Sequence, residues 1–256
     1  MTTTIPRSAD PTVRYLSTTQ AYDLWSAVYD TDGNFLQALD TIEVRSLLLR
    51  MLDMLNDGPY TQPWKFVDLG CGTGRNTAAL LEVGKASAVV GLDVSPGMLE
   101  VAERRLQKFH AEGRLKLEVF DMLQATSIPE SARSADAVVS TLVIEHVPAD
   151  IFFATAGKIL KPGGILLLTN MHSEMGKISQ AGFIDPKTGE KIRPISYAHT
   201  TEEVETAALG NAFELLGPME ERAVDESMVT VLGERSQKWV GVTVWFGGIF
   251  RKKGRM

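Results

Sequence analysis

The sequence predicts an α/β protein with a mostly parallel, doubly wound sheet whose two faces are both covered by helices. From residue 65 onward, short runs rich in apolar and β-branched residues alternate with amphipathic segments of helical periodicity. Inner runs such as AVVGL and ILLL show no polar alternation, which is typical of central strands buried on both sides. The five expected strands are KFVDL, SAVVGLD, LKLEVFD, DAVVSTL and GILLLTN, which begin at residues 65, 87, 115, 136 and 164.

Helix boundaries are marked at three places in the sequence. Apolar residues recur at three-to-four spacing over residues 35–55, and Gly58 with the proline after it ends this pattern, so a long helix is expected ahead of the sheet. Ser95 precedes a proline, a combination that is typical of a helix N-terminus. Thr200 and Glu203 form a capping-box pattern before another amphipathic segment.

Two further segments extend the alternation of strands and helices. Residues 171–199 follow the fifth strand, and the turn signal at 185–189 between short extended pieces predicts an inserted hairpin over one edge of the sheet. The segments ELLGPMEERAV and VGVTVWFGGIFRKK predict two last strands with an antiparallel finish. We therefore expect an N-terminal helical cap segment over 1–60 and an α/β domain over 61–256, which together form effectively one domain.

Length, composition and charge exclude several classes of protein. A chain of 256 residues with 44% hydrophobic side chains can bury a large core. It has no apolar run of the roughly 20 residues that a spanning helix needs, and its N-terminal sequence lacks the apolar core of a secretory signal, so we expect a cytoplasmic protein that binds no membrane. The single cysteine, Cys71, excludes an internal disulfide framework and a multi-cysteine metal site. A net charge of -6 disfavours a nucleic-acid partner, and the oligomeric state stays open.

A glycine-rich loop follows the first strand of the expected sheet. Gly70, Gly72 and Gly74 stand in LGCGTGRN, where a bare backbone can turn tightly and approach a ligand. Ligands of doubly wound sheets bind beyond the carboxyl ends of the strands, so this loop is expected at the binding site. A Walker loop is disfavoured because no Lys-Ser/Thr pair follows the last glycine, and a dinucleotide loop is disfavoured because Arg75 stands where its third glycine would fall.

Two aspartates after neighbouring strands indicate a ligand that contains a nucleoside. Asp93 ends the second strand and Asp121 follows the third, so both are expected at the same rim of the sheet as the glycine loop. A carboxylate in the first position can accept hydrogen bonds from both hydroxyls of a ribose. One in the second position can accept from an exocyclic amine of a base.

These motifs resemble those of the class I S-adenosylmethionine-dependent methyltransferases over roughly residues 22–253, in the segments VDLGCGTGRN, GLDVSPGML, FDM, DAVVSTLVIEHV and LKPGGILLLTN. The resemblance implies a Rossmann-like seven-stranded sheet with strand seven antiparallel between strands five and six. It also implies S-adenosyl-L-methionine as cofactor and S-adenosyl-L-homocysteine as product. The residues it assigns to cofactor binding are Tyr29, Asp68, Gly70, Cys71, Gly72, Asn76, Asp93, Val94, Met98, Asp121, Met122 and Thr141.

Within this set, Asp93 corresponds to the ribose position, Asp121 and Met122 to the adenine position, and the loop residues with Thr141 to the methionine part. The matching position of Tyr29 implies a tyrosine that closes over the cofactor near the methyl group. Together with the insertion at 171–199, this N-terminal segment is expected to form a lid that excludes water.

Two histidines are candidate general bases. Methyl transfer to a hydroxyl requires loss of a proton, whereas a neutral amine or an ionised carboxylate needs no base. His146 follows strand four and His172 follows strand five, so both are expected at the ligand-bearing rim. We expect no metal, because the positions where catechol-type relatives carry acids hold Thr141 and the pair Thr169-Asn170.

A small-molecule methyltransferase is the function that these features favour. The Asn/Asp-Pro-Pro-aromatic segment typical of enzymes that methylate nucleic acid bases is absent from STLVIEHV. We therefore expect methyl transfer to an O, N or C nucleophile of a small organic molecule such as a secondary metabolite. The alternatives are a protein or RNA methyltransferase, and a protein that binds the cofactor without transferring its methyl group.

Overall fold

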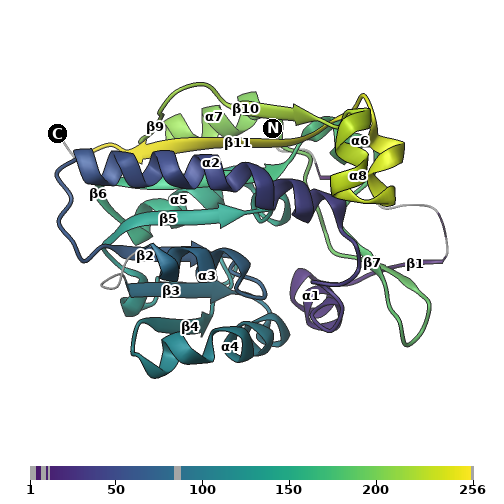
Figure 1. Cartoon of the computed structure of the whole chain (residues 1–256), viewed down its shortest axis with the longest axis horizontal. Helices are drawn as coiled ribbons and strands as arrows, with labels where there is room; N and C mark the ends of the chain where they lie inside the picture. The colour runs from purple at the N-terminus through teal and green to yellow at the C-terminus, as the bar shows by residue number, and fades with distance from the viewer. Residues whose placement is uncertain (1–3, 7–9, 11, 84–87, 255–256) are drawn as a thin grey trace.

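An eight-stranded sheet forms the centre of the computed structural model, which describes residues 4–6, 10, 12–83 and 88–254 (Figure 1). The strand order is β10-β11-β6-β5-β2-β3-β4, and β9 also pairs with β11. The strands are β2 (Lys65–Leu69), β3 (Ala88–Asp93), β4 (Leu115–Val119), β5 (Ala135–Thr141), β6 (Leu160–Met171), β9 (Phe213–Leu215), β10 (Glu220–Ala223) and β11 (Thr243–Lys252). The predicted α/β class with a mostly parallel sheet is confirmed. Residue 87, expected in the second strand, lies outside the described residues.

Helices cover both faces of the sheet because successive side chains of a strand point to opposite sides. The helices α2 (Phe35–Asp57), α3 (Arg75–Glu82) and α4 (Pro96–Ala111) contribute to one hydrophobic cluster, and α5 (Ala149–Ile159) and α7 (Thr201–Gly210) contribute to the other (Figure 1). In β6, Ile165 and Leu167 belong to the first cluster, whereas Leu166 and Leu168 belong to the second. All four are fully buried, which explains the unbroken apolar run in the sequence.

The helix boundaries follow the capping signals in the sequence. Ser95 Oγ accepts a hydrogen bond from the Met98 N–H at 3.1 Å and so caps α4. Thr200 and Glu203 form the predicted capping box at the start of α7. The long helix α2 ends directly before Gly58, as expected.

The antiparallel finish predicted for the last strands is present, but the outer strand is divided. β11 pairs antiparallel with β6 and lies between β6 and β10. The segment ELLGPMEERAV forms two strands, β9 and β10, which both pair with β11. Gly217 between them has a φ of +98°, and Pro218 has no N–H to donate to a ladder, so pairing stops there. The sheet therefore has eight strands where seven were expected.

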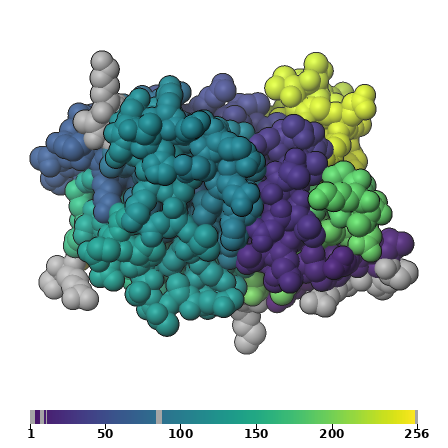
Figure 2. Space-filling model, turned by 90° about the horizontal axis from the view of Figure 1, so that it is seen from below, coloured from purple at the N-terminus to yellow at the C-terminus, as the bar shows by residue number. Residues whose placement is uncertain are grey.

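A second, three-stranded sheet lies at the carboxyl ends of the parallel strands (Figure 1). It consists of β1 (Val13–Tyr15), β8 (Lys191–Arg193) and β7 (Phe183–Ile184), in which β8 pairs parallel with β1 and antiparallel with β7. β7 and β8 form the expected hairpin, whereas its pairing with β1 was not predicted. Figure 2 shows the N-terminal segment in purple between the green insertion and the teal part of the α/β body. We call β1, α1 (Thr18–Trp25) and residues 171–199 the cover.

Several short helices complete the chain. α6 (Ser173–Ile178) belongs to the cover, η1 (Glu130–Ala132) precedes β5 and η2 (Ile144–His146) follows it. The segment between β10 and β11 contains η3 (Glu226–Met228), α8 (Val229–Leu232) and η4 (Glu234–Trp239), none of which was predicted from the sequence. Within the described ranges, no helix has the length and apolar character needed to cross a membrane.

Candidate active site

The loop after β2 presents bare backbone to a cavity. Gly70 has a φ of +79°, and a Cβ there would lie 2.2 Å from Val143 Cγ2, so a larger residue does not fit. Gly72 has a φ of +53° and lines the cavity, and a Cβ there would meet no atom within 4 Å. A ligand can therefore approach the backbone at Gly72 closely.

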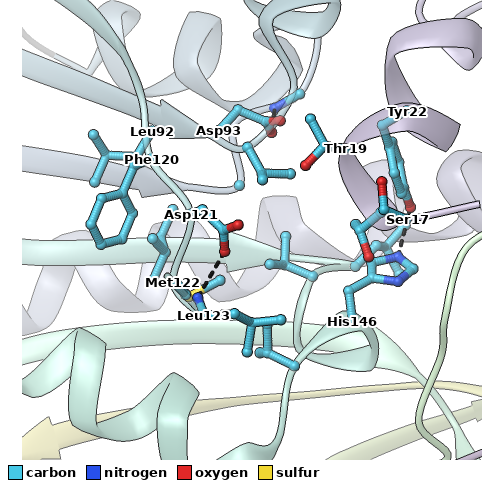
Figure 3. A pocket seen from close by; sticks show the side chains of 18 of the residues that line it. Ser17, Thr19, Tyr22, Leu92, Asp93, Phe120, Asp121, Met122, Leu123 and His146 are labelled. Atoms are coloured by element: carbon cyan, nitrogen blue, oxygen red, sulfur yellow. Dashed lines mark hydrogen bonds between the residues drawn. The ribbon is translucent and has the colours of Figure 1, made fainter. Parts of the chain in front are cut away.

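This space, which we call the first cavity, has a volume of about 240 Å³ and lies beyond the carboxyl ends of the parallel strands (Figure 3). Asp93 at the end of β3, Asp121 after β4 and Thr141 at the end of β5 all line it. Ser17, which caps α1, and Tyr22 of α1 in the cover form the facing wall (Figure 3). The cavity thus lies between the sheet rim and the cover.

The two aspartates are fixed by backbone amides. Asp93 Oδ2 accepts from the Gly72 N–H at 2.8 Å, and its Oδ1 accepts from the Ser95 N–H at 2.9 Å. Asp121 Oδ1 accepts from the Leu123 N–H at 2.8 Å (Figure 3). Both carboxylates keep lone pairs for a ligand, because an ionised carboxyl group has about four acceptor sites. Burial raises the pKa of Asp93, while the amides of Ser95 and Gly72 act in the opposite direction.

Thr141 is held by a buried polar network. Asn76 Nδ2 donates to Thr141 Oγ1 at 2.7 Å, and Arg75 Nη2 lies 3.4 Å from the same oxygen. Arg75 forms an ion pair at 2.6 Å with Asp40, a fully buried carboxylate on α2 that also accepts from Thr169 Oγ1 at 2.5 Å. A buried charge is tolerated only when it is paired in this way, so the network ties α2, α3 and β6 together behind Thr141.

His146 and Tyr22 meet at the wall of the first cavity (Figure 3). The Tyr22 hydroxyl lies 2.7 Å from His146 Nε2, and Nδ1 lies 3.1 Å from the carbonyl oxygen of Ile195. A carbonyl oxygen only accepts, so Nδ1 carries the proton of the neutral ring and Nε2 accepts from Tyr22. Burial raises the pKa of Tyr22 and of Tyr29, so both phenols stay protonated at neutral pH. Glu145 Oε1, 3.4 Å from Nε2, can stabilise positive charge on the ring after it takes up a proton.

A second cavity of about 130 Å³ adjoins the first, and Tyr22, Tyr29 and Leu142 line both. Leu142 has a φ of +57°, a left-handed conformation that residues other than glycine rarely adopt and that is often found at functional sites. Its N–H donates to the Thr169 carbonyl oxygen at 2.9 Å, which holds this backbone in place between the cavities. The other walls come from the cover, the start of α2, Glu145 of η2, and η4.

Comparison with known proteins identifies the family. Residues 67–168 match a family model described as a methyltransferase domain. An uncharacterized methyltransferase of Emericella nidulans is 49% identical over 259 residues, which cover 92% of this chain and 91% of that protein. The chain belongs to the class I S-adenosylmethionine-dependent methyltransferases.

Solved structures of methyltransferases share the fold. An S-adenosylmethionine-dependent methyltransferase from Mesorhizobium loti matches with a TM-score of 0.54 at 23% identity, covering 73% of this chain and 90% of that one. The phosphoethanolamine N-methyltransferase 2 of Haemonchus contortus, solved in complex with S-adenosyl-L-methionine, matches with a TM-score of 0.53 at 20% identity, covering 80% of this chain and 52% of that one.

The methyltransferase uses S-adenosylmethionine as its methyl donor, which confirms the predicted cofactor. The first cavity fits this molecule: the backbone at Gly72 is open to it, and the carboxylates of Asp93 and Asp121 lie on neighbouring strand ends. Asn76 reaches the cavity only through its hydrogen bond to Thr141. The predicted site residues that line this cavity are Tyr29, Gly70, Gly72, Asp93, Val94, Asp121, Met122, Thr141 and His146.

Two predicted residues of the loop region, Asp68 and Cys71, line neither cavity. Asp68 is buried and accepts from Thr77 Oγ1 at 2.6 Å, and burial raises its pKa to about 6. The Cys71 thiol faces β3, with Sγ only 3.0 Å from where a Cβ on Gly91 would lie. Both side chains are buried in the protein interior.

Met98 and His172 also lie outside the two cavities. Met98 is fully buried beneath the cover, in a cluster with Trp25. His172 caps α6, where its Nδ1 accepts from the Glu174 N–H at 3.2 Å, and its Nε2 lies 3.3 Å from Glu221 Oε1. This placement gives the prediction of His172 as a base no support, because the ring is already engaged at a helix start away from the ligand space.

Several residues of the two cavities were not predicted as site residues. Tyr22 stands in an aromatic run and Glu145 directly precedes His146, so the sequence held a signal for both. Lys191 and Arg235 line the second cavity, but only the fold brings them to it, and neither carries a signal in the sequence.

Proposed function

We propose that this methyltransferase methylates an O, N or C nucleophile of a small organic molecule that occupies the second cavity. The observation that carries the proposal is the common wall of Tyr22, Tyr29 and Leu142, which brings an acceptor in one cavity next to a cofactor in the other. The second cavity has a volume of about 130 Å³ and is bounded by the cover, which suits a compact molecule.

We assign the cofactor contacts according to the geometry of the first cavity. Asp93 accepts from the ribose hydroxyls, and Asp121 accepts from the adenine amine beside Met122. The backbone at Gly72 and the hydroxyl of Thr141 hold the methionine part. Asp68, Cys71 and Asn76 act as positioning residues behind this surface.

The cofactor supplies a methyl carbon on a positively charged sulfur: the lone pair of the acceptor bonds to this carbon, the carbon–sulfur bond breaks and its electron pair stays on sulfur. The residues of the chain align the acceptor and exclude water from this step. Tyr29, which lines both cavities, closes over the transferred group. An acceptor hydroxyl passes its proton to Tyr22, whose own proton moves to His146 Nε2 at 2.7 Å, and Glu145 stabilises the charged ring.

The rival acceptor is a protein or an RNA. Such a substrate requires an open groove, whereas the second cavity is bounded by the cover, and the net charge of -6 opposes attraction to a phosphate backbone. We therefore favour a small acceptor, and we retain the sequence-based proposals of a secondary metabolite, a cytoplasmic enzyme and a reaction without metal.

The experiment is incubation of the enzyme with methyl-labelled S-adenosylmethionine and, separately, a small-molecule extract, a protein extract and total RNA. We expect label only in the small-molecule pool. Label in the protein or RNA pool overturns the small-acceptor proposal. Binding of S-adenosylhomocysteine without label in any pool indicates a protein that holds the cofactor without transferring its methyl group.

A further inference from the structure

We propose that the methyl acceptor is a small acid, with a hydroxyl or amino group at its reacting end and a carboxylate or phosphate at its other end. This inference rests on the proposed function and names its substrate class. Three features of the second cavity carry it: unpartnered buried acceptors at the inner end, aromatic walls, and three cations at the outer end.

The inner end of the cavity requires hydrogen-bond donors from its occupant. Glu145 is 3% exposed and lines the cavity, and its Oε2 has no hydrogen-bond partner among the described residues. Gln180 Oε1 lines the same cavity and is likewise buried without a partner, while its Nε2 donates to the Pro194 carbonyl oxygen at 3.2 Å. A buried acceptor without a donor is costly, so a hydroxyl or amine beside Glu145 satisfies the site.

This end of the second cavity lies next to the first cavity. Glu145 Oε1 lies 3.4 Å from His146 Nε2, and His146 lines the first cavity. A hydrogen-bond donor next to Glu145 is therefore also the group that stands closest to the proposed proton path through Tyr22. The donor group of the acceptor is therefore its reacting group: a hydroxyl there donates to Glu145 Oε2 in the bound complex and turns its single proton toward the Tyr22 oxygen for the transfer step.

The middle of the cavity accommodates an apolar body. Trp25, Phe35 and Trp239 line it and are almost fully buried, and the rings of Phe35 and Trp239 stack with centroids 5.9 Å apart. Met171 and Met175 complete this wall. Flat aromatic faces and flexible thioethers suit a planar or aliphatic core.

The outer end is positively charged in a protein whose net charge is -6. Lys191 of β8 and Arg235 and Lys238 of η4 line the cavity and are exposed. In the ranges that the structure covers, none of the three has a carboxylate at ion-pairing distance, although Asp10 acts on Lys191 electrostatically. Burial, together with the like charges of Arg193 and Lys238, lowers the pKa of Lys191. An anionic group at this end relieves that repulsion, whereas a cationic group there adds to it.

A pair of matched probes tests the charge preference without knowledge of the natural acceptor. The probe 4-hydroxyphenylacetate carries a phenol and a carboxylate at opposite ends of one ring, and 4-hydroxyphenylacetamide lacks only the charge. In ligand-observed NMR titrations of the enzyme loaded with S-adenosylhomocysteine, we expect the acid to bind roughly tenfold more tightly than the amide.

Two triple variants locate the cause of this preference. Replacing Lys191, Arg235 and Lys238 together with glutamine should abolish the difference between acid and amide. The control replaces Arg104, Lys158 and Lys187 with glutamine, which removes the same charge from exposed positions outside both cavities and should keep the difference. Equal binding of acid and amide to the unchanged enzyme, or an equal loss in the control, overturns the proposal.

The labelled-methyl reaction then separates this inference from the proposed function. Products from the small-molecule extract are divided by anion exchange, and the mass of the labelled product distinguishes a carboxylic acid from a phosphate ester. Label in the retained fraction supports the acidic acceptor. Label only in neutral or cationic products overturns the acidic acceptor and leaves the proposal of small-molecule methylation intact. An absence of labelled product refutes the proposed function, and the probe titrations then decide the charge preference of the second cavity.

Discussion

Replacement of Asp93 by asparagine removes one charge from the first cavity and keeps the size of the side chain. Both carboxylate oxygens accept from backbone N–H groups, of Gly72 at 2.8 Å and of Ser95 at 2.9 Å. An asparagine has one acceptor oxygen, so one of these amides then faces an NH₂ group. The unpaired donor costs about 1–3 kcal/mol of folding stability.

The effect on cofactor affinity adds to this loss of stability. A hydrogen bond to a charged acceptor is worth about 1.5–3 kcal/mol, so loss of the charge opposite the ribose weakens binding by roughly 10- to 100-fold. The assay is calorimetric titration of S-adenosylhomocysteine, at a temperature where thermal unfolding shows the variant to be folded.

Asp136→Asn is the matched control. Asp136 is also a buried carboxylate that accepts from a backbone amide, that of Lys65 at 2.7 Å, but it lies at the amino end of β5, away from the cavity. The Asp136→Asn variant should lower folding stability and leave the affinity for S-adenosylhomocysteine unchanged. Affinity of Asp93→Asn within about threefold of the unchanged enzyme refutes the ribose assignment.

Three further predictions follow from buried groups. Burial raises the pKa of Asp68 from 3.8 to about 6. As the pH rises from 3.8 to about 6, Asp68 therefore loses its proton in the unfolded chain before it does so in the folded protein. The free energy of unfolding falls over this range by on the order of 3 kcal/mol. In urea unfolding, Asp68→Asn should therefore become more stable relative to the unchanged enzyme as the pH rises from about 4 to 7. A difference in unfolding free energy that stays constant over this range contradicts the raised pKa of Asp68. If Tyr22 and His146 form one proton path, Tyr22→Phe and His146→Asn should each lower kcat for a hydroxyl acceptor by roughly 100-fold, with little change in cofactor affinity. The double variant should then be no slower than either single variant. Additive losses of kcat argue for separate roles. The Phe183 ring stacks on Trp25 with centroids 5.1 Å apart. Phe183→Ala should therefore speed amide hydrogen exchange in residues 183–193 more than in the central sheet. Unchanged exchange in residues 183–193 contradicts a role of Phe183 in holding the cover closed.

The central fold could be predicted because its signals are local. The apolar run of β6 and the Ser95 cap each depend on a few consecutive residues, and the rim positions of Asp93 and Asp121 follow from strand order alone. The same reasoning places the glycine loop at the cavity.

The cover and the wall between the two cavities could not be predicted because their signals are not local. β1 is a three-residue strand whose partner is β8, and a segment this short carries no periodicity. Leu142 adopts a φ of +57° only because the surrounding structure imposes it. Asp40 is fully buried on α2, where a charge in an amphipathic pattern predicts an exposed face. His172 was expected at the ligand rim from strand order, but the start of α6 uses its ring as a cap.

The pairing of β1 with β8 also dictates the order in which a nascent chain can complete the enzyme. Val13 precedes β2 in the chain, whereas its partner Lys191 follows β6, so this pairing has to wait until β2 through β6 have been synthesised (Figure 1). The sheet rim that lines the first cavity can therefore form before the cover closes the second cavity. A change in residues 171–199 can therefore alter the second cavity while Asp93 and Asp121 at the ends of the parallel strands stay as they are.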